Sequence, residues 1–366
     1  MVSRLSSSGS GRIMNTLGPT PRVTATADFL RVKRAKITMD DHGLHKLKRL
    51  YLESRENEDS KQTLYNKRGH LNAFCDWAAD NDHPKASDLD GMNLLEYKLH
   101  LKNRDLTKTT IDNHFSTLRV FFKFCEDVDA IPSDTRLHDK LQHPEFAKGE
   151  QVRDEMLEAD HAEDALDYLE KYEYATRNHA LLTLLWHTGC RIGGARAIDL
   201  KDYTSAFDSQ NPNDYGWVEI RHRDQSDTPL KNGEEGERQV LLWPHVCEVI
   251  DDYIEGHRTD TRDDYERRPL FTTKHGRPAR DTLCKSVNAV TRPCYYQDSC
   301  PYDRDMGECE ATKYALASKC PGSKSPHPIR RGAITHYLDT KGWSYEDLSE
   351  RTNVSVKVLK EHYDET

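Results

Sequence analysis

Apolar residues recur with a helical period between Thr107 and Cys125, and no other feature constrains the fold of the chain as strongly. They stand at i, i+4, i+7, i+11 and i+14 and are Ile111, Phe115, Leu118, Phe122 and Cys125. This spacing places them on one face of an α-helix, with Thr107 as the expected N-cap. Weaker patterns of the same period predict earlier helices near residues 44–51, after Ser60, and near residues 94–101. Together these segments predict a small helical bundle over residues 40–146.

A polar, aperiodic stretch that begins at His143 separates this bundle from a second predicted domain, residues 147–366. After helical patterns, that domain contains two β-like runs, 217–222 and 239–243, with the turn-rich segment SDTPLKNGEEGER between them. This order predicts a β-hairpin with a long tip, and residues 269–273 are a candidate third strand. The expected fold class is mainly α, with an N-terminal helical bundle and an α-rich C-terminal domain that holds a small antiparallel β-sheet.

Charge and hydropathy predict a cytoplasmic protein without a membrane segment. The chain of 366 residues has a net charge of −9, and it has no run of about 18 apolar residues, which excludes a transmembrane helix. The first residues lack the apolar core of a secretion signal. The nine cysteines are therefore expected to be free thiols or metal ligands and not disulfides. An acidic surface of this kind suits a protein that works in high salt.

Positive charge gathers at the start of the chain. Residues 1–39 hold seven basic residues and one acidic residue, and they are rich in Ser, Gly and Thr without a sustained period. We expect a basic, disordered leader there, and a basic arm that contacts DNA is the alternative. Further basic residues lie around the last two helices of the bundle, where they form either a solvated face or a DNA-binding surface. These are Lys102, Arg104, Lys108, Arg119 and Lys123.

Two arginines stand in contexts that favour phosphate binding. Arg191 lies in HTGCRIGGARAIDL, where a helix–Gly–helix junction would direct its planar guanidinium into a cleft. Pairing with Asp199 or Asp202 would instead make it a structural residue. In HPIRRGAITHYL, His327 and Arg330 lie three residues apart and share a face near a helix N-terminus, which attracts anions. They form either a phosphate site with a proton donor or two unrelated surface side chains.

The chain ends in LSERTNVSVKVLKEHYDET, where Ser355 is the expected N-cap of a last helix. Tyr363 lies three residues from the end of this sequence. On these residues alone, it is either an aromatic side chain that anchors the helix or a nucleophile.

Taken in order, the bundle, the T-G-x-R junction, a hairpin that bears a lysine, H-x-x-R-R and a tyrosine about thirty residues later resemble the tyrosine recombinases of the phage integrase family. The resemblance covers roughly residues 42–366, and HPIRRGAITHYL followed by NVSVKVLKEHYD is most similar to haloarchaeal integrases and Xer-like recombinases. It implies a SAM-like core-binding domain over 40–146 and a catalytic domain over 147–366. The implied activity is site-specific cleavage and rejoining of duplex DNA through a 3′-phosphotyrosyl intermediate.

The same resemblance implies a role for each matching residue. Arg191 and Arg330 would neutralise the negative charge of the pentacoordinate phosphorane. Lys231 would protonate the leaving 5′-oxygen, and His327 would help to move the tyrosine proton. Tyr363 would be the nucleophile that attacks the scissile phosphate.

Asn353 occupies the position nearest to the second histidine or tryptophan that the family usually has. An amide can donate a hydrogen bond to phosphate but cannot transfer a proton. The resemblance further implies double-stranded DNA with paired inverted half-sites as the partner, and a homo-oligomer, from dimer to tetramer, on that DNA. No cofactor is needed for the implied chemistry, no membrane is involved, and the expected location is the cytoplasm, in association with the nucleoid.

Four cysteines, Cys294, Cys300, Cys309 and Cys320, lie within a Pro- and Asp-rich insertion, residues 294–320. Four thiolates in a loop suit a structural tetrahedral zinc, although their spacing contains no C-x2-C knuckle. A zinc site that braces the loop before His327 is the first interpretation, and free thiols in a redox-labile loop are the alternative.

Three other functions remain as alternatives at this stage. The segment SYEDLSERTNVSVKVLKEHY is compatible with a helix-turn-helix, and therefore with a DNA-binding regulator that has no catalytic activity. A zinc hydrolase is disfavoured because no H-E-x-x-H or similar ligand spacing occurs. A type IB topoisomerase would use the same chemistry as a recombinase, and the N-terminal bundle favours the recombinase.

Overall fold

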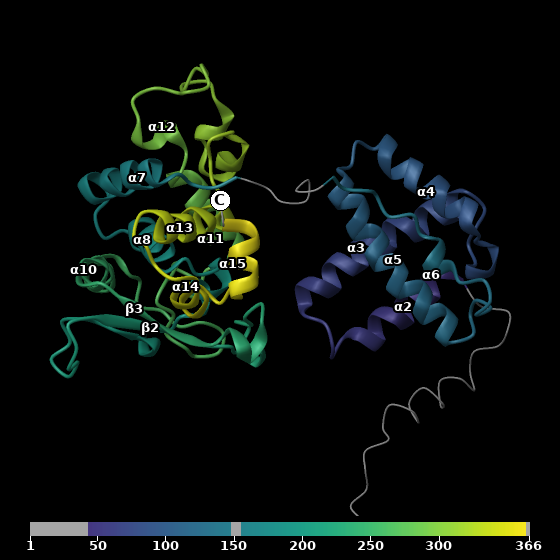
Figure 1. The fold of residues 1–366 in the computed structure, drawn as a ribbon, viewed down its shortest axis with the longest axis horizontal. Coiled ribbons are helices and arrows are strands. Elements are labelled where there is room, and N and C mark those ends of the chain that lie inside the picture. Colours follow the sequence, from purple (N-terminus) through teal and green to yellow (C-terminus); the bar gives the residue numbers. More distant parts are fainter. Residues whose placement is uncertain (1–42, 148–154, 364–366) are drawn as a thin grey trace, which may run out of the picture. The chain divides into compact units, whose positions relative to one another are not determined.

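The computed structural model of the chain describes residues 43–147 and 155–363 (Figure 1). These residues form two compact units, one before and one after residues 148–154. The predicted leader, residues 1–39, lies outside the described residues. No helix within the described ranges is both long and apolar enough to cross a bilayer.

The first unit is a helical bundle, as its periodicity predicts. Its helices are α2 (Leu44–Arg55), α3 (Lys61–Asp80), α4 (Gly91–Asn103), α5 (Lys108–Asp127) and the short α6 (Leu137–Lys140). The side-chain oxygens of Ser60 and Thr107 accept hydrogen bonds from main-chain N–H groups in the first turns of α3 and α5. Both predicted N-caps are therefore formed, and they satisfy donors that a helix leaves unpaired at its start.

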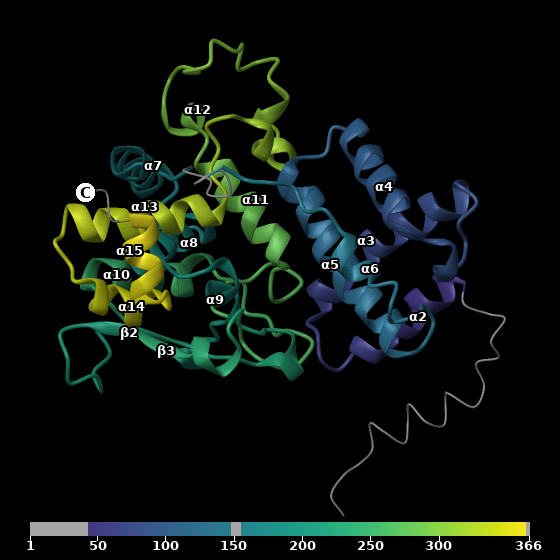
Figure 2. The ribbon, with the colours of Figure 1, turned by 45° about the vertical axis from the view of Figure 1, so that its right-hand side comes forward.

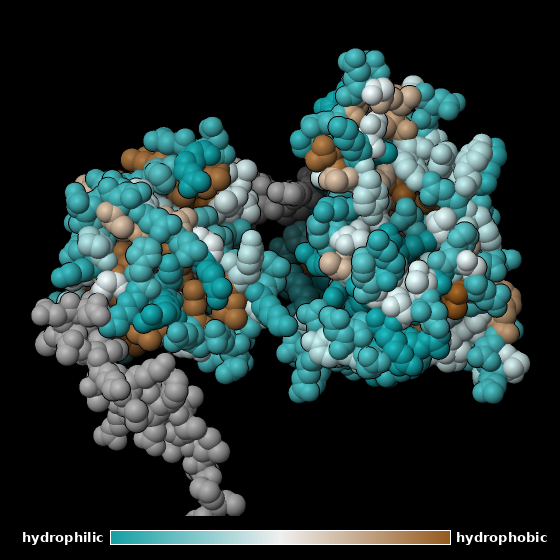
Figure 3. Space-filling model, turned by 180° about the vertical axis from the view of Figure 1, so that it is seen from behind, coloured by the Kyte–Doolittle hydropathy of each residue, from teal (hydrophilic) through white to brown (hydrophobic). Residues whose placement is uncertain are grey.

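Aromatic side chains fill the core of this bundle. The ring of Phe74 meets the rings of Tyr97 and Phe122 edge to face, at centroid distances of 5.0 Å and 5.5 Å. The basic side chains predicted around α4 and α5 lie on the outside of the unit and are exposed, namely Lys102, Arg104, Lys108, Arg119 and Lys123. The face of the molecule seen in Figure 3 is mostly hydrophilic, in keeping with a mean hydropathy of −0.87.

The second unit is built around α8 (Arg177–Thr188), a helix that is apolar on nearly all sides and buried for that reason. It packs against α7 (Ala159–Tyr172), α10 (Pro244–Asp252), α11 (Arg280–Val290) and α13 (Pro326–Asp339). The remaining α-helices described in this unit are α9 (Ile192–Ala197), α12 (Pro293–Tyr296), α14 (Tyr345–Thr352) and α15 (Val356–Tyr363). In Figures 1 and 2, α14 and α15 lie side by side near α13.

A small antiparallel sheet lies beside these helices, and its strands follow the order β1–β2–β3. Strands β2 (Gly216–Ile220) and β3 (Arg238–Leu242) form the predicted hairpin, with Val218 opposite Val240. The third strand is β1 (Tyr203–Thr204), so the prediction of a strand over residues 269–273 is wrong. Pro269 has no N–H to donate to a ladder, and it makes only an isolated bridge with Asp199.

Gly332 allows α13 to approach the segment before α7. A Cβ atom at this position would lie only 1.9 Å from the main-chain oxygen of Leu157, so only glycine fits. The N–H of Leu157 also donates a hydrogen bond to the carbonyl of Pro328, at 3.1 Å. These two contacts hold the first half of α13, which carries two of the candidate site residues.

Candidate active site

The ends of α8 and α14 and the start of α9 meet at one point in the second unit. Gly189 is the C-cap of α8 and has φ +58°, a conformation that glycine adopts without strain. A Cβ atom there would lie 3.2 Å from Cγ2 of Thr352, the last residue of α14. Arg191 follows as the N-cap of α9. The predicted helix–Gly–helix junction is therefore present, and it brings the end of α14 beside Arg191.

Arg330 points from α13 to the same place. Only 3% of its surface is exposed, and its Nη1 and Nη2 atoms donate hydrogen bonds to the carbonyls of Gly189 and Thr352, at 2.6 Å and 2.7 Å. Nη1 of Arg191 donates to the carbonyl of Asn353, at 3.3 Å. The carbonyls at a helix C-terminus carry partial negative charge, which attracts a guanidinium group. Main-chain oxygens thus orient both arginines.

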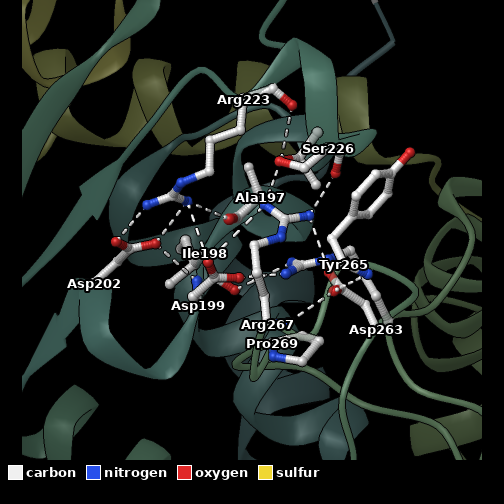
Figure 4. Close-up of polar contacts among 12 residues, drawn as sticks. Ala197, Ile198, Asp199, Asp202, Arg223, Ser226, Asp263, Tyr265, Arg267 and Pro269 are labelled. Carbon is white, nitrogen blue, oxygen red and sulfur yellow. Dashed lines mark hydrogen bonds and ion pairs between the residues drawn. The ribbon is translucent and has the colours of Figure 1, made fainter.

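Neither arginine has a carboxylate partner among the described residues. Asp199 and Asp202, which could have paired with Arg191, bind other arginines (Figure 4). Arg223 makes a bidentate pair with Asp202, at 2.7 Å and 2.9 Å, and Arg277 binds Asp199. The structural interpretation of Arg191 as a partner of these aspartates is therefore excluded.

Burial of the positive charges of Arg191 and Arg330 raises the free energy of the folded protein. Burial, together with the nearby charges of Arg191 and Arg238, lowers the pKa of Arg330 to about 9. Burial also lowers the pKa of Arg191. A buried charge without a counter-ion inside the protein favours binding of an external anion.

Lys231 lies in the connection between β2 and β3, and it is exposed. His327 stands in the first turn of α13. Partial burial lowers the pKa of His327, and the positive charges of Arg330, Arg331, Arg191 and Lys231 lower it as well. The charges of the lysine and of these three arginines are therefore close enough to act on the imidazole of His327.

Tyr363 is the last residue of α15 and is half-buried. Its ring centroid lies 5.8 Å from Cζ of Arg331. Burial raises the pKa of the Tyr363 phenol, while the positive charges of Arg330, Arg331 and Arg191 act in the opposite direction. The phenol is therefore close enough to these arginines for their charges to act on it.

Asn353 forms the corner between α14 and α15, in the left-handed conformation with φ +54°. Its Oδ1 accepts a hydrogen bond from Nδ2 of Asn232 at 2.6 Å, and its Nδ2 donates to the carbonyl of Glu235 at 2.9 Å. Both ends of the amide are thus bonded to the connection that carries Lys231. The structure brings all six predicted residues into one region, with Asn353 turned toward the hairpin.

Sequence reasoning missed two further arginines. Arg331 contacts the Tyr363 ring, and its signal was the second arginine of HPIRR. Arg238, on β3, donates from Nε to the carbonyl of Arg351 at 2.7 Å and adds positive charge beside Arg191. A basic residue at the start of a strand is too common to stand out, so only the fold identifies Arg238.

The four cysteines of residues 294–320 do not form the expected zinc site. In the part of the chain that the structure describes, no group of three or more His, Cys, Asp and Glu side chains is arranged to hold a metal ion. Cys320 is buried, whereas Cys294, Cys300 and Cys309 are partly exposed, and all four are free thiols. Burial raises the pKa of the Cys294 thiol. The free-thiol interpretation agrees with this geometry.

A network of buried ion pairs lies next to the site and supports α9. Asp199, which is 2% exposed, binds Arg277, and Arg277 also donates from Nε to Asp263 at 2.9 Å. Arg267 contacts Asp263 at 2.9 Å in the same network (Figure 4). Nη1 of Arg277 donates to the carbonyl of Arg196 on α9, at 2.5 Å. The network therefore ties the end of the α9 helix to the segment around residue 263.

Comparisons with known proteins identify relatives of this chain and proteins of similar fold. Residues 50–127 match the family described as phage integrase, N-terminal SAM-like domain. Tyrosine recombinase XerD of Oceanobacillus iheyensis is 22% identical over 60% of this chain, and the match spans 66% of that protein, just under two thirds. Tyrosine recombinase XerC of a Roseiflexus species is also 22% identical, over 84% of this chain and 85% of its own. The Tn1549 transposon integrase, solved in complex with a circular intermediate DNA, has a similar fold, with a TM-score of 0.60, 16% identity, and coverage of 88% of this chain and 95% of its own.

Proposed function

We propose that this chain, a member of the tyrosine recombinase family, cuts and rejoins duplex DNA at a specific site through a covalent bond between Tyr363 and a 3′-phosphate. One observation carries the proposal. The guanidinium groups of Arg191 and Arg330 lie close enough to the Tyr363 phenol for their charges to act on it, and they have no carboxylate partner in the described ranges. A phosphodiester supplies the anion that such a cluster favours, and the phenol supplies a nucleophile.

In the proposed reaction, the phenolic oxygen of Tyr363 attacks the scissile phosphorus, and the bond from phosphorus to the 5′-oxygen breaks. His327 takes the phenol proton, and Lys231 gives a proton to the departing 5′-oxygen. Arg191 and Arg330 bind the non-bridging oxygens, whose negative charge grows in the pentacoordinate transition state. Attack of a 5′-hydroxyl on the phosphotyrosine reverses these steps and reseals the strand. Because the covalent bond to tyrosine retains the energy of the phosphodiester, the reaction needs no nucleotide cofactor.

The pKa directions support these proton transfers. The pKa of His327 lies below the usual value, so its imidazole is neutral at neutral pH and ready to accept a proton. The pKa of Tyr363 is raised by burial, so the phenol keeps its proton until a base removes it. The surrounding arginines then stabilise the phenolate as it forms.

We also propose the partners of this reaction. Exposed cations on the first unit, such as Lys102, Arg104 and Arg119, would contact phosphates of duplex DNA and set the position of the protein. Two to four copies would assemble on paired inverted half-sites, each cleaving one strand. The proposed setting is the nucleoid of an archaeal cytoplasm at high salt, since the chain is acidic overall.

The first test is covalent trapping on nicked duplexes taken from the DNA that flanks the gene. Wild-type protein, Tyr363→Phe and Tyr302→Phe would be compared on a denaturing gel, with Tyr302→Phe as the matched control because Tyr302 is exposed and lies in the cysteine-containing insertion. We expect an adduct from the wild type and the control, and none from Tyr363→Phe. DNA binding by all three proteins without any adduct would overturn the proposed function and favour a non-catalytic regulator.

A second measurement separates a recombinase from a type IB topoisomerase, whose chemistry is the same. Supercoiled plasmids with and without the trapped site would be incubated with the protein. We expect strand exchange between two copies of the site and little relaxation of the plasmid that lacks it. Efficient relaxation of both plasmids would contradict site specificity.

A further inference from the structure

Asn353 joins two parts of the candidate site that are far apart in the sequence. Its side-chain amide binds Asn232 and the carbonyl of Glu235, both in the β2–β3 connection, at 2.6 Å and 2.9 Å. Its main-chain carbonyl accepts the hydrogen bond from Arg191, at 3.3 Å. The carbonyl of the preceding residue, Thr352, accepts from Arg330, at 2.7 Å. One corner of the backbone thus contacts the hairpin through a side chain and both arginines through its main chain.

A second contact joins the hairpin to α14, at the start of β3. Arg238 donates from Nε to the carbonyl of Arg351, at 2.7 Å, and from Nη1 to the carbonyl of Gly236, at 2.9 Å. The Arg238 contact fixes the start of β3. On the other side of Lys231, the N–H of Leu230 donates to Nδ1 of His222 at 3.0 Å, and the Leu230 side chain packs against the core. The amide of Asn353 attaches the residues between these two points, at Asn232 and Glu235.

The Lys231 side chain is exposed and makes no ion pair with any residue in the described parts of the chain, although the main chain of the preceding Leu230 is bonded to His222. A flexible lysine on a long connection samples many positions, and a general acid must lie within hydrogen-bond reach of the oxygen that it protonates. A misplacement of about 1 Å can reduce a rate by about 100-fold. Attachment of the neighbouring Asn232 therefore matters for the position of the ammonium group.

We propose that Asn353 is a positioning residue for Lys231, which holds the tip of the β2–β3 connection against the α14–α15 corner so that the ammonium group meets the leaving 5′-oxygen. This inference rests on the proposed function. It assigns Asn353 a different role from the direct phosphate contact that its place in the sequence implied. Nδ2 donates one of its two N–H groups to the carbonyl of Glu235, which directs the amide toward the hairpin.

A turn requirement alone would also place an asparagine at φ +54°, because asparagine tolerates the left-handed region better than most residues. Asn353→Gly separates the two explanations, since glycine keeps this backbone conformation and its carbonyl but removes the amide. Asn232→Ala removes the same attachment from the hairpin side and leaves the corner untouched. The attachment predicts the same defect in both variants, whereas the turn requirement predicts no defect in either.

The decisive experiment compares two substrates in single-turnover cleavage. One is the ordinary duplex, and the other carries sulfur in place of the bridging 5′-oxygen at the scissile phosphate. A thiol has a pKa of about 8.5 and leaves without being protonated, so the sulfur substrate makes the general acid unnecessary. We expect Asn353→Gly and Asn232→Ala to cleave the ordinary duplex about 10- to 100-fold more slowly than the wild type. On the sulfur substrate, both should come within about threefold of the wild type, as should Lys231→Ala, while Arg191→Ala should remain slow.

The outcomes distinguish failure of the positioning role of Asn353 from failure of the proposed function. If the wild type forms an adduct on both duplexes but the Asn353→Gly defect persists on the sulfur substrate, Asn353 acts on the phosphate directly and the positioning role is wrong. Wild-type activity in Asn232→Ala on the ordinary duplex would also overturn that role. If the wild type forms no adduct on either duplex, the proposed function itself fails. Amide hydrogen exchange without DNA gives a second readout, in which residues 231–236 should exchange faster in both variants than in the wild type.

Discussion

The charge of Arg330 leads to an unusual expectation for a residue that is 3% exposed: its removal should change stability little and activity greatly. The difference between its pKa of about 9 and that of an ordinary arginine corresponds to about 5 kcal/mol of unfavourable charge in the folded state. Because the pKa is lower in the folded state, this cost is fully present at neutral pH and is relieved only as the pH rises above about 9.

Two hydrogen bonds offset this cost. The guanidinium group donates to the carbonyls of Gly189 and Thr352, and bonds that involve a charged group contribute about 1.5–3 kcal/mol each. Arg330→Met removes the charge and both bonds while it keeps an apolar chain of similar length. The two contributions nearly cancel, so we expect the free energy of unfolding to change by less than about 2 kcal/mol. Cleavage should fall by at least about 100-fold, because one cation at the phosphate is lost.

Urea unfolding followed by tryptophan fluorescence measures this change, with and without sulfate as a phosphate mimic. Sulfate should stabilise the wild type by about 1.4 kcal/mol at ten times its dissociation constant, and it should stabilise Arg330→Met clearly less. Arg351→Met is the matched control, since Arg351 is also buried and donates to the carbonyls of Leu241 and His187. Its guanidinium also lies over the rings of Tyr337 and Trp343, at 5.5 Å and 5.3 Å.

The control should lose about 2–4 kcal/mol, because cation–π contacts and hydrogen bonds disappear together, and it should keep the wild-type response to sulfate. A loss of more than about 4 kcal/mol by Arg330→Met, together with a wild-type response to sulfate, would contradict this expectation. Arg330 would then be a structural arginine like Arg351.

Two further predictions concern the neighbours of this site. Because the pKa of His327 is lowered, the rate of single-turnover cleavage by the wild type should stay constant down to pH 6.5 and fall only below that pH. Cleavage by His327→Ala should be about 100-fold slower and should become faster as the pH rises, because hydroxide replaces the missing base. Identical pH profiles for the two proteins would exclude His327 as the base. Asp199→Asn should lower the free energy of unfolding by about 3–5 kcal/mol, since it leaves Arg277 buried with one carboxylate partner fewer. A loss below about 1 kcal/mol in urea unfolding would show that the ion pairs around Asp199 contribute little to stability.

The sequence predicts the helices of this fold better than its strands. The face formed by Ile111, Phe115 and Phe122 spans several turns, so its period is unmistakable, and Ser60 and Thr107 mark helix starts by a local hydrogen bond. By contrast, the strand at Tyr203–Thr204 has two residues and no pattern of its own, so only its pairing with β2 identifies it. Short strands depend on partners far away in the chain, and local sequence does not contain that information.

For the candidate site, the sequence predicts which residues matter but not how they are held. Arg191, Arg330 and Tyr363 belong to motifs whose order and spacing stand out in a single chain. That carbonyls of Gly189 and Thr352 orient Arg330 depends on how the ends of α8 and α14 meet, which is a property of the packed fold. The same is true of Asn353, whose hydrogen-bond partners lie more than a hundred residues away.

Arginines of the second unit differ in their acceptors, because some pair with carboxylates and others donate only to main-chain carbonyls. Arg223 and Arg277 bind Asp202 and Asp199, so their charges are neutralised inside the protein and they need no further partner. Arg330 donates only to neutral carbonyls, which fix its direction and leave its charge available. The positive charge of such an arginine has no counter-ion before an anion binds and is neutralised when one does. Anion binding therefore recovers part of the free energy that burial of the charge costs. Acceptor type alone does not separate structure from function, because Arg351 also donates to carbonyls, those of Leu241 and His187. Arg330 differs from Arg351 because its charge acts on Arg191 and on the Tyr363 phenol.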